Sequence, residues 1–395
     1  MNLFKNKVGL IVPVVALLVI FVFSLTLFPS AKVQPVQLPV ALVNEDEGFQ
    51  LPNQPEMNMG STMVEMIEQM TSANPAQAEA FRWIEVGSEE EVKEGLDDQE
   101  YYAALVIPGD FSQKQASLRT EQPAASEIII YINQGMNPAA STLAGQALGG
   151  IVDKMNVSVR EQLLSGFDAQ NALLTAKQAS LLASPIQKQV INVNETGTQS
   201  ANGNAPVSLL QPLWMASIAS AAILYIALRK AQARTLNERL LSKVYQIGIT
   251  AAAGIGVGFG LTWLARDMVG FAIPQYTDTA WFLTIAFISF CLLQTAVVSW
   301  LGLQGISIFA LMLFFGIPLM TLAPELMSSF YREWIYSWLP MRFLVEGLRE
   351  LFFFDQGLSW SQISVLTWIG LASAGVIMLS VYKPLAAADQ KSLQG

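Results

Sequence analysis

The residues best suited to act on a solute are charged side chains that share one face of a short amphipathic segment. Between residues 341 and 354, Arg342, Glu346, Arg349 and Glu350 recur at i, i+4, i+7 and i+8, opposite a leucine and phenylalanine face. This spacing predicts a helix with all four charges on one side. Such a face could line or gate a path for a substrate. Alternatively, the segment is only an outer cap of the protein.

Few other residues could carry catalytic chemistry. The 395 residues include no histidine and one cysteine, Cys291, which lies in an apolar run. Histidine-based acid–base catalysis, histidine-ligated metal sites, an intrachain disulfide and a CxxC metal site are therefore excluded. No G-x-x-x-x-G-K-[ST] motif occurs, so the chain cannot hydrolyse ATP unaided. We expect no catalytic residue, no cofactor and no metal, and hence a protein that is not an enzyme.

Four glycines at alternate positions form a second motif. Gly254, Gly256, Gly258 and Gly260 give two overlapping GxxxG pairs, which in a membrane helix allow a neighbouring helix to approach closely. A dinucleotide-binding fingerprint would need glycine at position 261, where Leu261 stands. The glycines therefore predict helix packing rather than nucleotide binding.

The consecutive acids Glu45, Asp46 and Glu47 could hold a calcium ion. The D-x-D-x-D spacing of a dedicated calcium loop is absent, which favours a solvated turn.

The elements that must position these residues are those of a membrane protein. The chain is 52% hydrophobic and 13% charged. About 20 apolar residues cross the roughly 30 Å core of a bilayer, and six segments of that kind occur: 8–28, 207–228, 244–264, 280–301, 304–323 and 362–382. The run from 280 to 323 would be about 66 Å long as one helix, so we expect a break near Gly302 and Gly305.

The first segment is predicted to be an uncleaved signal anchor. Its apolar stretch is longer than a signal-peptide core, and Pro29-Ser30-Ala31 is a poor cleavage site. We therefore assign residues 1–28 to a cytoplasmic tip and first span, and residues 207–395 to a membrane domain of five helices.

Basic residues orient the spans. Five of them follow the second span: Arg229, Lys230, Arg234, Arg239 and Lys243. By the positive-inside rule this loop is cytoplasmic, and Lys5, Lys7 and Lys383 place both termini inside as well. Residues 29–206 are then outside the cell. They carry 9 basic and 22 acidic residues, a net charge of −13, which argues against nucleic acid as a partner.

The 29–206 region is predicted to be a small α/β domain. Strands are expected at 37–44, 81–86, 101–107 and 127–133, and helices at 57–70, 89–96 and from about 139 to 183. A Gly/Asn/Ser linker at 194–206 leads into the second span. With the apolar segments, the expected fold is an α-helical polytopic membrane protein of six spans with an α/β extracytoplasmic domain inserted after the first.

The segment 324–361 before the last span is the most unusual part of the membrane region. Residues 329–339 carry five aromatic side chains of the kind found at bilayer interfaces: Phe330, Tyr331, Trp334, Tyr336 and Trp338. Pro340 separates them from the charged segment described first. Two short amphipathic helices divided by a proline predict a re-entrant or interfacial hairpin on the outer side.

Several strings taken together resemble the YhgE/Pip family of bacterial membrane proteins, within the type-2 ABC exporter permeases. They are PVALVNEDEG (39–48), YYAALVIPGDFS (101–112), IYINQGMNP (130–138), NGNAP with LW (202–214) and LPMRFLVEGLRE (339–350). Their order along the chain also matches that family. The compact outer domain departs from the far longer outer region of many members.

The resemblance implies a permease subunit of an exporter in the bacterial plasma membrane, driven by a separate ATP-binding subunit. It further implies a homodimer, or a heterodimer with a related permease, and a lipid, drug or peptide-like substrate. Only seven residues precede Val8, so residues 229–243 are the expected surface for docking the ATP-binding subunit. The alternative is a non-transporting surface receptor, like a phage receptor, or a secretion-assembly protein acting through its outer domain.

Overall fold

The computed structural model describes residues 34–50, 57–73, 75–171, 173–230 and 235–383, with isolated positions before residue 34. The chain divides into two compact units. The sheet unit comprises Val33–Thr196 and Leu322–Arg332, and the helical unit comprises Met1–Lys32, Gly197–Thr321 and Glu333–Gly395. Each unit is described separately below.

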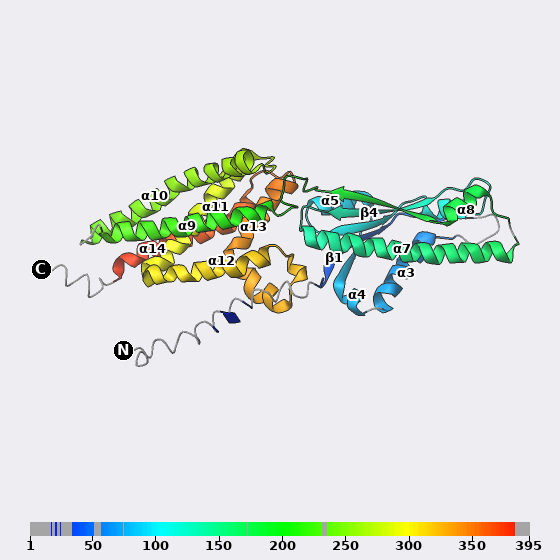
Figure 1. Cartoon of the computed structure of the whole chain (residues 1–395), viewed down its shortest axis with the longest axis horizontal. Coiled ribbons are helices and arrows are strands. Elements are labelled where there is room, and N and C mark those ends of the chain that lie inside the picture. Colours follow the sequence, from blue (N-terminus) through cyan, green and yellow to red (C-terminus); the bar gives the residue numbers. More distant parts are fainter. Residues whose placement is uncertain are drawn as a thin grey trace, which may run out of the picture. The chain divides into compact units, whose positions relative to one another are not determined.

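The sheet unit, in which Figure 1 labels β1 and β4, is built on five strands in the order β2-β1-β3-β4-β5. They are β1 Leu38–Asn44, β2 Phe81–Glu85, β3 Ala103–Ile107, β4 Ser126–Asn133 and β5 Ile186–Val193. Strand β1 pairs in parallel with β2 and β3, β4 is antiparallel to β3, and β5 is parallel to β4. The central strands β1 and β3 are apolar along their length because both of their faces are buried.

Helices cover both faces of this sheet. They are α3 Met59–Ala73, α4 Pro75–Ala80, α5 Glu89–Asp97, α6 Phe111–Ser117, α7 Pro138–Ala169 and α8 Ala176–Leu182. The long α7 begins at Asn137, whose side chain accepts hydrogen bonds from the backbone N–H groups of Ala139 and Ala140. It packs against the sheet along a stripe of buried small and aliphatic residues. Val92 and Leu96 of α5 pack on the opposite face.

The sheet unit confirms the α/β character and the four expected strands, within two residues at their ends. The continuous helix expected from about 139 to 183 is wrong. Helix α7 ends at Ala169, Asn171 adopts a left-handed backbone (φ 50°), and the short α8 follows. The fifth strand, β5, was not expected, because its side chains from Gln187 to Gln189 are polar and exposed at the sheet edge.

The helical unit contains the apolar helices. They are α9 Ala205–Lys230, α10 Leu236–Trp263, α11 Tyr276–Leu301, α12 Ile306–Met320, α13 Pro340–Phe353 and α14 Trp360–Leu379. Shorter turns extend or join them: η3 Leu264–Val269, η4 Gly302–Gly305, η6 Phe330–Ile335, which begins in the sheet unit's part of the chain, η7 Tyr336–Trp338 and η8 Ser380–Tyr382. Helix α11 packs against α9, α10 and α14, and most of its residues are buried.

Four helical stretches among the described residues are long and apolar enough to cross a membrane: Ala205–Arg229, Leu236–Val269, Tyr276–Met320 and Trp360–Tyr382. The third is 45 residues long and includes η4, where Gly302 has a positive φ of 72° that glycine tolerates. The predicted spans 280–301 and 304–323 both fall on it. Because most of residues 8–28 lie outside the described residues, the count of six spans stays a prediction.

The connection between α12 and α13 departs from the expected pair of amphipathic helices. Before Pro340 the chain forms short irregular helices: the 3-10 turn η5 Pro324–Leu326, the six-residue π-helix η6 and the 3-10 turn η7. Within the sheet unit, Glu325 anchors this connection, since its carbonyl accepts from Val36 N at 2.8 Å and its carboxylate accepts from the Tyr102 hydroxyl at 2.8 Å. A regular helix begins only at Pro340, whose missing N–H costs nothing in the first turn.

Candidate functional site

Helix α13 carries the charged face and is held tightly inside the helical unit. A Cβ atom at Gly347 would lie 2.4 Å from Cζ of Phe282 on α11, and one at Gly316 on α12 would lie 2.6 Å from Sδ of Met341. Leu344, Leu348 and Leu351 are fully buried on the apolar side. The sequence pattern therefore produces the predicted helix, and two glycine contacts fix where it lies against its neighbours.

The four charged residues of α13 lie on one side of the helix but have different surroundings. Arg349 is buried and donates from Nη2 to the carbonyl of Met320 at 3.3 Å. The Glu346 carboxylate accepts a hydrogen bond from the Tyr336 hydroxyl at 3.0 Å. The Arg342 guanidinium lies over the rings of Phe343 and Tyr336, 4.5 and 5.7 Å from their centroids. Tyr336 was missed as a partner, because only its aromatic character was evident from the sequence.

Burial shifts the pKa values of acidic groups on and beside the charged face of α13, which lies outside the four candidate spans. It raises the pKa of Glu346 above its ordinary value, against the opposing pull of Arg342 and Arg349. Burial also raises the pKa of Glu350 and of Tyr336. The two carboxylates therefore hold protons more firmly than solvated glutamates do. The charged face of α13 thus combines two cations with two acids whose raised pKa values favour the neutral form.

Two of the four predicted packing glycines lie against α11. A Cβ at Gly254 would be 2.5 Å from Cγ1 of Ile288, and one at Gly258 would be 2.1 Å from Oγ1 of Thr284. At Gly256 and Gly260 an added Cβ would meet nothing within 4 Å. The 254/258 pair thus sits where α10 and α11 approach each other closely, and the 256/260 pair does not.

Of the predicted docking residues, Arg229, Arg239 and Lys243 lie at the end of the helical unit where α9 ends and α10 begins. Arg239 donates from Nη2 to the carbonyl of Lys383 at 2.6 Å, and Lys243 donates to Oγ of Ser299 at 3.3 Å. Arg229 is exposed near the end of α9. Lys230 is the last residue of α9, and Arg234 lies outside the described residues.

Lys383 was not singled out from the sequence as a contact residue, although a lysine after an apolar helix is a signal for helix capping. Its Nζ donates to the carbonyl of Trp300 near the end of α11 at 2.7 Å. Together with Arg239 and Lys243, it ties the ends of α10, α11 and α14 together through hydrogen bonds. Part of the basic cluster is therefore already engaged within the chain.

The acidic turn of the sheet unit corrects one expectation. Asp46 is buried and accepts hydrogen bonds from the backbone N–H groups of Gly60 and Ser112, both at 2.8 Å, and from the Ser112 hydroxyl. It joins the starts of α3 and α6 instead of facing solvent. Glu47 next to it is exposed. In the part of the chain that the structure describes, no group of three or more His, Cys, Asp or Glu side chains is placed to hold a metal ion.

Comparisons with known proteins point in one direction. A family model described as "ABC-2 family transporter protein" matches residues 7–382. The "Uncharacterized protein YhgE" of Bacillus subtilis (strain 168) is 24% identical over 158 residues, which is 39% of this chain and 19% of that protein. The match thus spans about a fifth of the length of this relative.

A solved structure is also similar to part of the chain. It is a domain of a "putative ABC type-2 transporter" from Thermotoga maritima MSB8 and is 20% identical, with a TM-score of 0.26. The match covers 42% of this chain and 97% of that domain.

Proposed function

Because the chain belongs to the ABC-2 transporter family, we propose that it is the permease subunit of an ABC-type exporter, which moves a lipid, drug or peptide-like substrate out of the cell. The observation that carries this proposal is the match of the family model to residues 7–382, which includes both units. The apolar helices agree with residence in a membrane. Within such a system the chain is a transport subunit and not itself an enzyme.

Energy for export would come from a separate ATP-binding subunit, since the sequence has no phosphate-binding motif of its own. We assign its docking surface to the basic end of the helical unit, formed by Arg229, Lys230, Arg234, Arg239 and Lys243. The hydrogen bonds from Arg239 and Lys243 join the ends of three helices there. A movement of the docked ATP-binding subunit would therefore displace the ends of α10, α11 and α14 together. Coupling of ATP hydrolysis to transport requires such a joint movement.

The outer exit would be controlled by α13. Of its charges Arg342, Glu346, Arg349 and Glu350, the first three lie near Tyr336. The hydrogen bond from Tyr336 to Glu346 joins the turn before Pro340 to the helix after it. Breaking that bond would free the turn from the helix. Two copies of the chain, or one copy with a related permease, would form the path between their helical units.

Export in this direction requires a defined topology, with both termini in the cytoplasm and residues 29–206 outside, in a bacterial plasma membrane. Because Cys291 is fully buried, a single added cysteine can report which side a residue faces. We expect Gln170→Cys, at the exposed end of α7, to react with a membrane-impermeant maleimide in intact cells. Asn237→Cys, at the exposed start of α10, should react only after the membrane is opened.

The docking surface is tested by replacing exposed Arg229 together with Lys230. The Arg229→Gln/Lys230→Gln variant should lose most of the ATP-binding subunit that copurifies with the wild-type chain. A Lys154→Gln variant, which removes an exposed charge from α7, serves as the control and should retain it. Labelling of Asn237→Cys from outside, or equal copurification in both variants, would reject this arrangement and favour the receptor or assembly role.

A further inference from the structure

In the sheet unit the neighbouring parallel strands β1 and β2 are followed by helices on opposite faces. After β1 the chain passes to α3, and after β2 it passes to α5. Helix α5 packs on the face that carries Ala41 and Val43, whereas Ser61 and Val64 of α3 lie beside Leu42 and Asn44 on the other face. The two connections therefore diverge to opposite faces.

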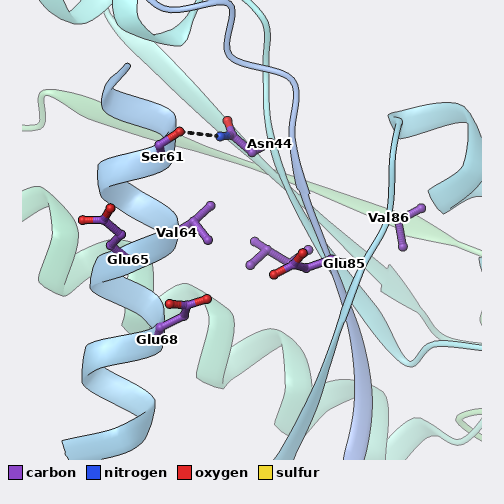
Figure 2. Close-up of a pocket in the computed structure, with 8 residues that line it drawn as sticks. Asn44, Ser61, Val64, Glu65, Glu68, Glu85 and Val86 are labelled. Carbon is purple, nitrogen blue, oxygen red and sulfur yellow. Dashed lines mark hydrogen bonds between the residues drawn. The ribbon is translucent and has the colours of Figure 1, made fainter. Parts of the chain in front are cut away.

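A cavity of about 350 Å³ opens at this position. Its lining comes from the ends of both strands, Leu42 and Asn44 of β1 with Glu85 and Val86 at the end of β2, and from Ser61, Val64, Glu65 and Glu68 of α3. Figure 2 shows Glu68 and Glu85 on the two sides of the space, while the carboxylate of Glu65 turns away from the strands. A hydrogen bond of 3.5 Å from Asn44 to Ser61 joins the strand to the helix at one end of the cavity.

The chemistry of the lining selects a cation. It includes three carboxylates and no basic side chain, and within the described residues Glu65, Glu68 and Glu85 form no salt bridge or side-chain hydrogen bond. The region 29–206 carries a net charge of −13, which attracts cations toward the whole unit. Leu42 and Val64 add an apolar surface beside the acids.

The same lining favours an organic cation over a metal ion. No three acidic side chains in the described part of the chain are grouped as a metal would require. The cavity volume lies in the range of small-molecule sites, which are mostly apolar with a few placed polar groups. We propose that this cavity binds small organic cations, with an ammonium group between Glu68 and Glu85 and an apolar body against Leu42 and Val64. This site does not depend on the exporter function.

The test uses the purified full chain in nanodiscs of zwitterionic phosphatidylcholine, titrated calorimetrically with benzyltrimethylammonium. We expect saturable binding at one site per chain, and a loss of affinity of at least tenfold in a Glu68→Gln/Glu85→Gln variant. Both substitutions keep side-chain size and break no contact. The matched control, Glu47→Gln/Glu161→Gln, removes the same charge from exposed positions elsewhere on the unit and should bind like the wild type.

Two further titrations separate this proposal from simpler explanations. Benzyl alcohol, which is neutral, should not bind saturably, and Mn²⁺ should not displace the ammonium compound at stoichiometric concentration. The proposal is overturned by no binding of benzyltrimethylammonium, by equal affinity in the two double variants, by equal binding of benzyl alcohol, or by stoichiometric displacement with Mn²⁺. No binding, or equal affinity in the two double variants, would mean that the site is only a diffuse acidic surface. Equal binding of benzyl alcohol would indicate an apolar pocket, and displacement by Mn²⁺ would indicate a metal site.

Discussion

The sheet unit and the helical unit use many of their buried polar side chains differently. Buried polar side chains join distant segments of the sheet unit: Asp46 links the starts of α3 and α6, and Asn133 donates to the carbonyl of Leu96 at 2.6 Å. In the helical unit the buried hydroxyls of Thr250, Thr262 and Thr284 bond carbonyls one turn back in their own helices, and glycines allow neighbouring helices to approach, with Gly258 against Thr284 and Gly347 against Phe282. The difference follows from the solvent. Lipid tails are as apolar as leucine, so helices in a bilayer gain more from close packing than from burial of apolar area.

The two units also differ in whether a buried side-chain amide, Asn133 or Gln294, has hydrogen-bond partners. Asn133 in the sheet unit uses its amide to bond two carbonyls. Gln294 on α11 is 1% exposed, yet neither its Nε2 nor its Oε1 has a hydrogen-bond partner among the described residues. A buried amide without partners costs free energy in this arrangement of the helices. We therefore expect the sheet unit to be a fixed scaffold and α11 to be the element that changes its surroundings during transport.

The largest effect is expected from Asp46→Ala. The substitution leaves two backbone N–H groups and one hydroxyl buried without an acceptor, which should lower the free energy of unfolding of the sheet unit by about 4 kcal/mol. Thermal unfolding and limited proteolysis of the full chain in detergent would show this. Glu47→Ala removes the same charge from an exposed neighbour and should change stability by less than about 0.5 kcal/mol. Equal effects would mean that Asp46 does not hold the unit together.

The next effect tests steric packing in the helical unit. In Gly258→Ala the added Cβ would meet Thr284 Oγ1 at 2.1 Å and the Ala280 carbonyl oxygen at 2.5 Å, so α10 must move away from α11. We expect a loss of about 2 kcal/mol, seen as a lower midpoint of thermal unfolding in detergent. Gly260→Ala, in the same helix and with open space at its Cβ, is the control and should behave like the wild type. A harmless Gly258→Ala would contradict the close approach.

Smaller effects, of opposite sign, are expected on the free energy of unfolding when each of the two buried amides is replaced by leucine. Gln294→Leu should leave stability unchanged or raise it by about 1 kcal/mol, because it removes two unsatisfied polar atoms. Asn133→Leu should lower stability by about 2 kcal/mol, because it leaves the carbonyls of Leu96 and Tyr101 without that donor. Both are measured by unfolding of the full chain. Destabilisation by Gln294→Leu would show that the amide has a partner essential to the fold.

The smallest effect concerns pH in the sheet unit. Hydrogen bonds from Lys93 and Tyr131 lower the pKa of Glu89 below its ordinary value. A lowered pKa in the folded state gives stability that is present above the unfolded-state pKa and is lost as pH falls through the folded-state value. Because this pair is near the surface, the contribution should be about 0.5 kcal/mol. Glu89→Gln should therefore lose this much at pH 7 and match the wild type at pH 2 to 3. The same deficit at both pH values would contradict the assignment.

The parts that sequence could predict are those set by local pattern. Strands β1 and β3 are continuous apolar runs bounded by turn residues, and the charged face of α13 follows from its spacing. Strand β5 could not be recognised, because its pairing with β4 outweighs the polar character of Gln187 to Gln189.

Contacts between distant residues explain the remaining differences. The burial of Asp46 depends on residues 14 and 66 positions away. The two GxxxG pairs are identical as motifs, and only the position of α11 distinguishes Gly258 from Gly260. Likewise the cavity beside β1 is formed by β1, α3 and the end of β2 together, which no single segment encodes.

The most direct test of the central claim is to isolate the chain from native membranes in mild detergent after light crosslinking, and to identify its partners by mass spectrometry. As the permease subunit of an ABC exporter, it should carry a stoichiometric subunit with a phosphate-binding motif, and the complex should hydrolyse ATP. An intact chain that reproducibly lacks such a subunit would contradict this account and would favour a receptor or assembly role for the sheet unit.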